Sequence, residues 1–154
     1  MRKQLYAFIL VLASLSFLGG CGFKTAAPDA SVQGEQAVHA AYSQVGKPYC
    51  YGGASPQQGF DCSGLVYWCY AKNGVKVPRR TTGQMQAGCP VDLDESQPGD
   101  IVVFRIRGNN MHTGLYAGNN AFIHSPRKGS KVRKESLQSP YWKNRLVSIR
   151  RVTN

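Results

Sequence analysis

The chain is 154 residues long, 42% of them hydrophobic, and carries a formal net charge of +11 at pH 7. This length supports one compact domain with a hydrophobic core, and neither an internal repeat nor a second domain is evident. The basic excess suits an anionic partner, although an ordinary solvated surface would account for many of the charges equally well.

The first residues form an export signal. Arg2 and Lys3 make a charged start, and residues 5–18 are an apolar run. This run is short for a membrane-spanning helix, so a transmembrane anchor is the weaker alternative. Its ending, Leu18-Gly19-Gly20-Cys21, resembles the bacterial lipobox, in which cleavage falls before a cysteine that receives lipid. Because Gly22 and not aspartate follows, the resemblance implies a lipid anchor in the outer membrane, facing the periplasm.

We therefore expect a signal peptide at residues 1–20, a lipidated tether at 21–31 and a folded domain at 32–154. The tether is rich in small and polar residues, which makes it flexible. Export argues against nucleic acid and favours cell-wall polymer or lipid headgroups as the anionic partner. The densest basic cluster, at residues 127–134, lies in a predicted loop, and its spacing does not indicate a phosphate site.

Helical patterns fill the first half of the domain. Residues 31–45 have apolar side chains at helical spacing, followed by a Gly-Lys-Pro stop. Asp61 is a suitable N-cap for a second helix, which begins at Cys62 and meets a glycine stop at Gly74. We also predict an extended piece at residues 49–51, a loop at 52–59 and a short helix at 81–87.

The pattern then changes to that of strands, at residues 100–106, 112–117, 121–125 and 145–152. Helices followed by antiparallel strands indicate an α+β fold, with the helices packed on one side of a central antiparallel sheet.

Four cysteines follow the lipobox, namely Cys50, Cys62, Cys69 and Cys89. In an oxidising compartment an even number suggests disulfides. Cys62 and Cys69, however, would lie about 10 Å apart on one helix at 1.5 Å per residue, too far to bridge. The sequence contains no C-x-x-C pair, which is the spacing that would indicate a zinc site. At least one of these cysteines therefore has another role.

Cys62 is the candidate for that role. The start of a helix offers unpaired N–H groups and the positive end of the dipole, which together favour a thiolate. The small Ser63 and Gly64 are expected to leave room for a substrate. Cys69, inside the apolar run, fits a buried structural cysteine instead.

A cysteine nucleophile needs a base. His39 is expected to be a surface or packing residue, whereas His112 and His124 lie on two successive predicted strands. A hairpin centred near Gly118 would place them directly opposite each other, provided that the turn is not shifted. His112 would then be the base and His124 its orienting group. The alternative is two unrelated strand histidines.

The stretches PYCYGGASPQQGFDCSGLV, HTGLYAG and AFIHS resemble the three signature blocks of the NlpC family of papain-like cell-wall cysteine peptidases. The resemblance covers residues 38–152 and implies a papain-like α+β fold. It implies that Cys62 is the nucleophile, His112 the base and His124 the third member of the triad. It further implies that Tyr49 helps to hold the oxyanion and that Asp61 and Ser63 contact the substrate peptide.

The expected activity is that of a monomeric peptidoglycan endopeptidase that needs no metal or organic cofactor. The resemblance implies cleavage of the stem peptide between D-glutamate and diaminopimelate, where Arg79 or Arg80 could bind a carboxylate. Two alternatives remain: an amidase or acyltransferase with the same triad, and a non-catalytic, disulfide-stabilised lipoprotein that binds cell wall. Cys50 departs from the usual signature and could form a disulfide with Cys89.

Overall fold

The computed structural model describes residues 30–153, so the predicted signal peptide and the lipidation site Cys21 lie outside the described residues. The helices are α1 (Ala30–Tyr42), α2 (Cys62–Lys72), α3 (Thr81–Gln84), a 3₁₀ turn η1 (Leu93–Glu95) and α4 (Pro140–Lys143). The strands are β1 (Ala54–Ser55), β2 (Gly59–Phe60), β3 (Cys89–Val91), β4 (Ile101–Arg107), β5 (Asn110–Tyr116), β6 (Ala121–His124), β7 (Arg133–Ser136) and β8 (Leu146–Arg151). Within the described residues, no helix is long and apolar enough to cross a membrane.

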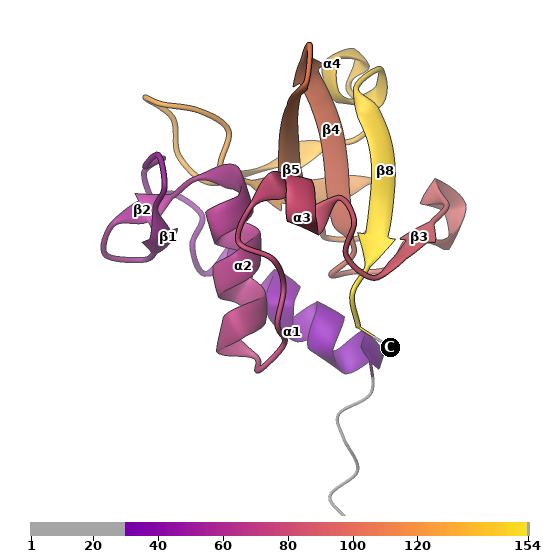
Figure 1. Cartoon of the computed structure of the whole chain (residues 1–154), viewed down its shortest axis with the longest axis horizontal. Helices are drawn as coiled ribbons and strands as arrows, with labels where there is room; N and C mark the ends of the chain where they lie inside the picture. Colours follow the sequence, from indigo (N-terminus) through magenta and orange to yellow (C-terminus); the bar gives the residue numbers. More distant parts are fainter. Residues whose placement is uncertain (1–29, 154) are drawn as a thin grey trace, which may run out of the picture.

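A six-stranded antiparallel sheet in the order β3-β8-β4-β5-β6-β7 forms the centre of the domain. The two long N-terminal helices, α1 and α2, lie together on one side of it, and α4 lies at the far end of the strands (Figure 1). The predicted α+β class is therefore confirmed, as are the four predicted strands. The first helix begins at Ala30, so the last two residues of the predicted tether are already helical.

The sheet has an apolar core on each face because alternate residues of each strand point to opposite sides. Ile101, Val103 and Leu115 face α1 and α2, where they pack with Leu65 and Cys69. On the other face, a second cluster gathers the side chains Val102, Phe104, Tyr116, Phe122, Leu137, Trp142 and Ile149. This second cluster brings α4 onto the sheet beside the two strand histidines.

Helix α2 begins where the sequence predicted. The Asp61 carboxylate accepts a hydrogen bond from the Gly64 N–H at 2.6 Å and caps the first turn. Gly64 is small for a reason other than substrate access, since a Cβ there would collide with the Gly53 carbonyl oxygen. The tight contact presses the β1–β2 hairpin onto the start of α2 and so fixes the position of Cys62.

Strand β7 was missed because its four residues, Arg133 to Ser136, are polar and lie at an edge of the sheet. The prediction of a loop throughout residues 127–134 is wrong at its end, since Arg133 and Lys134 belong to β7. Charged residues on an edge strand hinder pairing with other chains, which explains why the apolar alternation is absent. The expected loop at 52–59 likewise contains strand β1 and the start of β2.

Candidate active site

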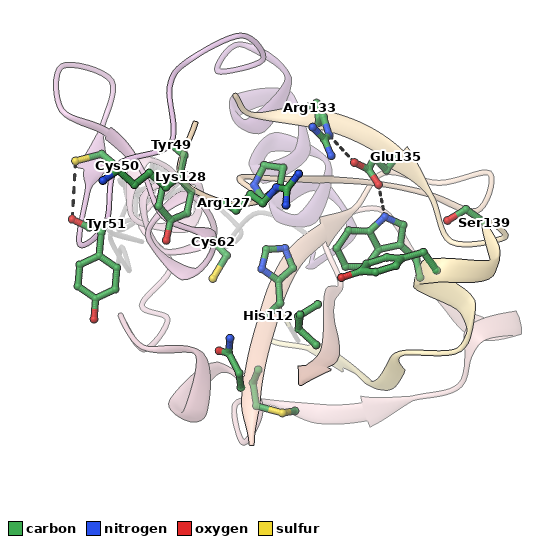
Figure 2. A pocket seen from close by; sticks show the side chains of 16 residues that line it. Tyr49, Cys50, Tyr51, Cys62, His112, Arg127, Lys128, Arg133, Glu135 and Ser139 are labelled. Atoms are coloured by element: carbon green, nitrogen blue, oxygen red, sulfur yellow. Dashed lines mark hydrogen bonds and ion pairs between the residues drawn. The ribbon is translucent and has the colours of Figure 1, made fainter. Parts of the chain in front are cut away.

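A cavity of about 1010 Å³ opens where the start of α2, strand β5, strand β7 and helix α4 converge. Its lining includes Tyr49, Cys62, His112, Arg127, Glu135 and Trp142, which come from widely separated parts of the sequence. Figure 2 shows Cys62 between Tyr49 and the imidazole of His112. The structure thus brings the predicted nucleophile, base and oxyanion residue into one pocket.

Cys62 is the first residue of α2 and is partly exposed to this pocket. Its Sγ lies 3.8 Å from the hydroxyl oxygen of Thr81, at the start of α3. The thiol therefore stands at the end of α2 where the first backbone N–H groups have no partner within the helix. Cys69, two turns further along, is fully buried, and burial raises the pKa of its thiol.

His112 and His124 are in contact, but not as directly opposed residues. Strands β5 and β6 pair Leu115 with Ile123 and Tyr116 with Phe122, so the hairpin is centred one position later than predicted. In this register His124 lies opposite Gly114, two residues from His112 and on the same face. The two rings still meet, with His112 Nε2 and His124 Nδ1 2.7 Å apart.

Gly114 makes this diagonal contact possible. A Cβ at this position would lie 3.1 Å from Cβ of His124 and 2.9 Å from the ring of Phe122. Because glycine has no side chain, His124 can lean across position 114 toward His112. Gly114 therefore has a packing role that the predicted register did not require, because that register placed His124 directly opposite His112.

Burial keeps both histidines neutral near pH 7. The pKa of His112 is lowered by desolvation and by its neighbour His124, against a smaller opposing effect of Glu135. The pKa of His124 is likewise lowered by desolvation, and the charge of Glu135 again opposes the change. A neutral imidazole can accept a proton, which is the state that a general base requires.

Sequence reasoning missed two residues around the histidines. The Trp142 ring stacks on His112 with an interplanar angle of 25° and meets His124 edge-on. The Glu135 carboxylate accepts hydrogen bonds from Trp142 Nε1 and from Arg133 Nε, and its Oε1 lies 3.4 Å from His124 Nε2. The only signal in the sequence for Glu135 was that it is a single acidic residue within a strongly basic stretch.

Tyr49 lies on the opposite side of Cys62 from His112 (Figure 2). Its backbone N–H is bound to the Ser130 carbonyl at 2.9 Å, which fixes the residue at the rim. Burial raises the pKa of the phenol, and nearby Cys62 and Asp61 raise it further. The hydroxyl therefore stays protonated and can donate a hydrogen bond.

Three of the four residues predicted to bind substrate form an internal network. Arg79 pairs with both carboxylate oxygens of Asp61, at 3.0 and 2.9 Å, and also donates to the Ser63 hydroxyl at 3.1 Å. Ser63 is buried, and Arg80 is exposed at the start of α3. None of the four is among the residues that line the cavity, so their contact with substrate stays a prediction.

All four cysteines of the described domain are free thiols. The suggested Cys50–Cys89 disulfide is therefore not formed in the structure. Cys50 lies by the β1–β2 hairpin, whereas Cys89 begins β3 on the opposite side of the molecule (Figure 1). Cys62 is available as a thiol, as nucleophilic chemistry requires.

The cavity combines a thiol at a helix start, a neutral imidazole with a second imidazole behind it, and a protonated phenol. This set suits nucleophilic attack on an acyl group, with a base to activate the sulfur and a donor for the oxyanion. Three basic residues, Arg127, Lys128 and Arg133, also line the cavity and favour an anionic substrate.

Comparison with known proteins gives consistent results. The profile of the NlpC/P60 family matches residues 46–151. Murein DD-endopeptidase MepH of Escherichia coli (strain K12) is 43% identical over 122 residues, which make up 75% of this chain and 45% of that protein. The bifunctional muramidase/DL-endopeptidase CwlT of Bacillus subtilis (strain 168) is 37% identical over 121 residues, 77% of this chain and 36% of that protein.

A solved structure is also similar over most of the domain. The crystal structure of an NlpC/P60 family protein from Bacillus cereus ATCC 10987 superposes with a TM-score of 0.73 at 30% identity, over 79% of this chain and 40% of that one. The chain thus spans less than half the length of each of these three proteins.

Proposed function

The chain belongs to the NlpC/P60 family, and from this membership we propose that it is a peptidoglycan endopeptidase that uses Cys62 as its nucleophile. The observation that carries the proposal is the shared pocket of Cys62, at the start of α2, and His112, a buried histidine in contact with a second one. The names of the related endopeptidases support the same class of reaction.

The reaction begins with transfer of the Cys62 thiol proton to His112. Since His112 Nε2 faces His124, the nitrogen that remains for the proton is Nδ1. The thiolate then attacks the carbonyl carbon of a peptide bond, and a tetrahedral oxyanion forms. The Tyr49 hydroxyl and the backbone N–H of Cys62 are its proposed donors.

Collapse of the tetrahedral intermediate breaks the C–N bond. The protonated His112 gives its proton to the leaving amine, and the acyl group stays on Cys62 as a thioester. His112 then takes a proton from water, which attacks the thioester and releases the acid. Return of that proton to sulfur restores the thiol, so the cycle balances without a cofactor.

The charge of the cavity supports a peptide that carries free carboxylates. Arg127 and Lys128 line it and form no ion pair within residues 30–153. Stem peptides of peptidoglycan carry such carboxylates, and a charge-assisted hydrogen bond to one is worth about 1.5–3 kcal/mol. These two side chains are better placed for that contact than Arg79, whose guanidinium is bound to Asp61.

Two bonds are candidates for cleavage. The bond between D-glutamate and diaminopimelate is implied by the DCSG signature block, and the name of CwlT includes a DL-endopeptidase. The crosslink between D-alanine and diaminopimelate is the second candidate, because the 43% identical MepH is named a DD-endopeptidase.

Digestion of purified muropeptides separates these candidates. Monomeric and crosslinked muropeptides of defined stem length are incubated with the protein, and the fragments are identified by mass spectrometry. Muramyl-alanyl-glutamate indicates the first bond, and conversion of crosslinked dimers to monomers indicates the second. Release of whole stems from muramic acid would replace the endopeptidase by an amidase.

The controls are two serine variants. Cys62→Ser should abolish digestion, whereas Cys89→Ser, at an exposed position outside the cavity, should leave it within twofold of the parent. A Cys62→Ser protein with undiminished activity, or a parent with none, would refute the proposal and favour a wall-binding role.

We also propose that the domain acts as a monomer on an outer-membrane lipid anchor at Cys21. The support is the lipobox-like ending Leu18-Gly19-Gly20-Cys21. Cys21→Ser should release the protein from outer-membrane fractions, and retention of an unprocessed protein would favour a transmembrane anchor. Light scattering of the domain should give the mass of one copy, and a dimer mass would contradict the proposed monomer.

A further inference from the structure

Glu135 lies next to the buried His124, with its Oε1 3.4 Å from His124 Nε2. It lies on the edge strand β7, where residue 135 pairs with Phe122 of β6. Its carboxylate accepts hydrogen bonds from Trp142 Nε1 and Arg133 Nε, so both oxygens are held in place (Figure 2). The proposed reaction cycle assigns it no step.

The nearest polar neighbour of Glu135 on the histidine side is His124 Nε2. This nitrogen is fully buried and has no partner that meets hydrogen-bond geometry, and Glu135 Oε1 lies 3.4 Å away. If Nε2 carried a lone pair, this buried lone pair would face a carboxylate oxygen, which is repulsive. If Nε2 carries the proton, its N–H points at a negative charge. Glu135 therefore selects the Nε2–H tautomer of His124.

This choice of tautomer is passed on to His112. With its proton on Nε2, His124 presents a lone pair at Nδ1. The 2.7 Å contact to His112 Nε2 then requires that His112 supply the proton. His112 Nδ1 is left with a lone pair on the side of the cavity.

We infer that Glu135 is a positioning residue that fixes the tautomers of His124 and His112 and leaves Nδ1 of His112 unprotonated, ready for the Cys62 proton. The inference deepens the proposed function and rests on it only for the role of Cys62 as nucleophile. Glu135 acts through His124 and does not touch the reacting atoms.

The charge of Glu135 has a second effect. Burial alone would raise the pKa of this carboxyl, but hydrogen bonds from Trp142 and Arg133 outweigh it and lower the pKa, so Glu135 is ionised. Its charge raises the pKa of both histidines against their burial, while Arg133 lowers that of His124. When His112 becomes an imidazolium, Glu135 supplies the negative charge behind the pair.

Trp142 connects the two effects. Its indole N–H holds Glu135, and its ring stacks on His112 at a centroid distance of 5.6 Å. The Glu135 carboxylate and the His112 imidazole thus both contact the Trp142 side chain, which limits how far either group can move.

The test uses Glu135→Gln, which keeps the shape of the side chain and removes its charge. An amide has one acceptor oxygen, so it cannot accept from His124, Trp142 and Arg133 as the carboxylate does. The matched control is Glu35→Gln, which makes the same change at an exposed position on α1. Circular dichroism and thermal unfolding establish that each variant is folded.

The first readout needs no cell-wall substrate. The rate of Cys62 alkylation by iodoacetamide is followed by mass spectrometry at pH 6 and at pH 9.5. We expect Glu135→Gln to slow alkylation about tenfold at pH 6, where the thiolate depends on a neighbouring imidazolium. At pH 9.5 the thiolate forms without that help, so the rate should stay within twofold. Glu35→Gln should match the parent at both pH values.

The second readout is muropeptide digestion, in which Glu135→Gln should lower kcat about 10- to 100-fold and change KM less than twofold, as loss of an orienting partner does. An unchanged ratio of the alkylation rates at pH 6 and pH 9.5 overturns the inference. If Glu135→Gln does not fold, Trp142→Phe replaces it, because this variant keeps the aromatic ring and removes the N–H that holds Glu135. An unchanged ratio there overturns the inference equally. A changed ratio in a protein that digests no muropeptide would support the inference and refute the proposed function.

Discussion

Replacement of Arg79 by alanine should destabilise the domain without a direct effect on the reacting atoms. Arg79 binds both oxygens of Asp61, at 3.0 and 2.9 Å, and donates to the Gly53 carbonyl at 3.2 Å. It therefore joins the loop before β1 to the N-cap of the helix that carries Cys62. Its neighbour Arg80 is exposed and offers a matched control of the same charge.

The expected magnitude follows from these contacts. A charged hydrogen bond contributes about 1.5–3 kcal/mol when it is well protected. The Arg79 side chain is 32% exposed, so water replaces part of what is lost, while Asp61 is only 14% exposed and keeps the Gly64 and Gly52 N–H groups. We therefore expect Arg79→Ala to lower the free energy of unfolding by about 2 kcal/mol, near the low end of that range for the whole bidentate pair. Arg80→Ala should change it by less than about 0.5 kcal/mol.

Urea denaturation followed by circular dichroism measures both variants. Arg79→Lys adds a further check, because lysine keeps the charge but lacks the two-pronged geometry, and it should lose about half as much. Equal stabilities of the two alanine variants would refute the structural role. A rise in KM for muropeptides with unchanged stability would instead restore the prediction that Arg79 binds substrate.

Two further predictions concern buried groups. The pKa values of His112 and His124 are lowered to about 3 and about 4, well below their value of about 6.5 in an unfolded chain, so the unfolded state binds more protons below pH 6.5. The free energy of unfolding should therefore fall by about 2 kcal/mol per histidine between pH 7 and pH 5, measured by urea denaturation, and His124→Gln should remove about half of this dependence. Tyr70→Phe should cost about 1–2 kcal/mol in the same assay, because the buried Tyr70 hydroxyl donates to the Gly99 carbonyl; an unchanged stability would mean that this carbonyl finds another donor.

The sequence predicted the parts of the fold whose signals are local. The cap at Asp61 and the glycine stop at Gly74 bound α2, and apolar alternation located β4, β5, β6 and β8. Strand β7 carried no such signal, because an edge strand of charged residues buries little. The β1–β2 hairpin was missed for a related reason, since each strand has only two residues and is held by close backbone contacts.

In the candidate site, too, the residues with local sequence signals were predicted and the others were missed. Cys62 was a candidate because it lies at a predicted helix start, and His112 and His124 were candidates because of their spacing across a predicted turn. The register of that turn was wrong by one position, because Asn119 and Asn120 both adopt positive φ and shift the turn beyond Gly118. The histidines still meet, since the shift preserves the face and Gly114 leaves space for the diagonal approach.

Arg79 and Glu135 show why the remaining assignments needed three dimensions. Both are charged residues near the predicted site, and the sequence alone does not show which neighbour either side chain binds. Arg79 is hydrogen-bonded to Asp61, 18 positions earlier in the sequence. Glu135 faces His124 from strand β7, and the pairing of β7 with β6 could not be predicted because the residues of β7 are polar. What distinguishes them is the neighbour that each charge would lose on mutation. For Arg79 that neighbour is a helix cap, so the cost falls on stability. For Glu135 it is an imidazole whose tautomer sets the base, so we expect the cost to fall on the pH dependence of Cys62 reactivity.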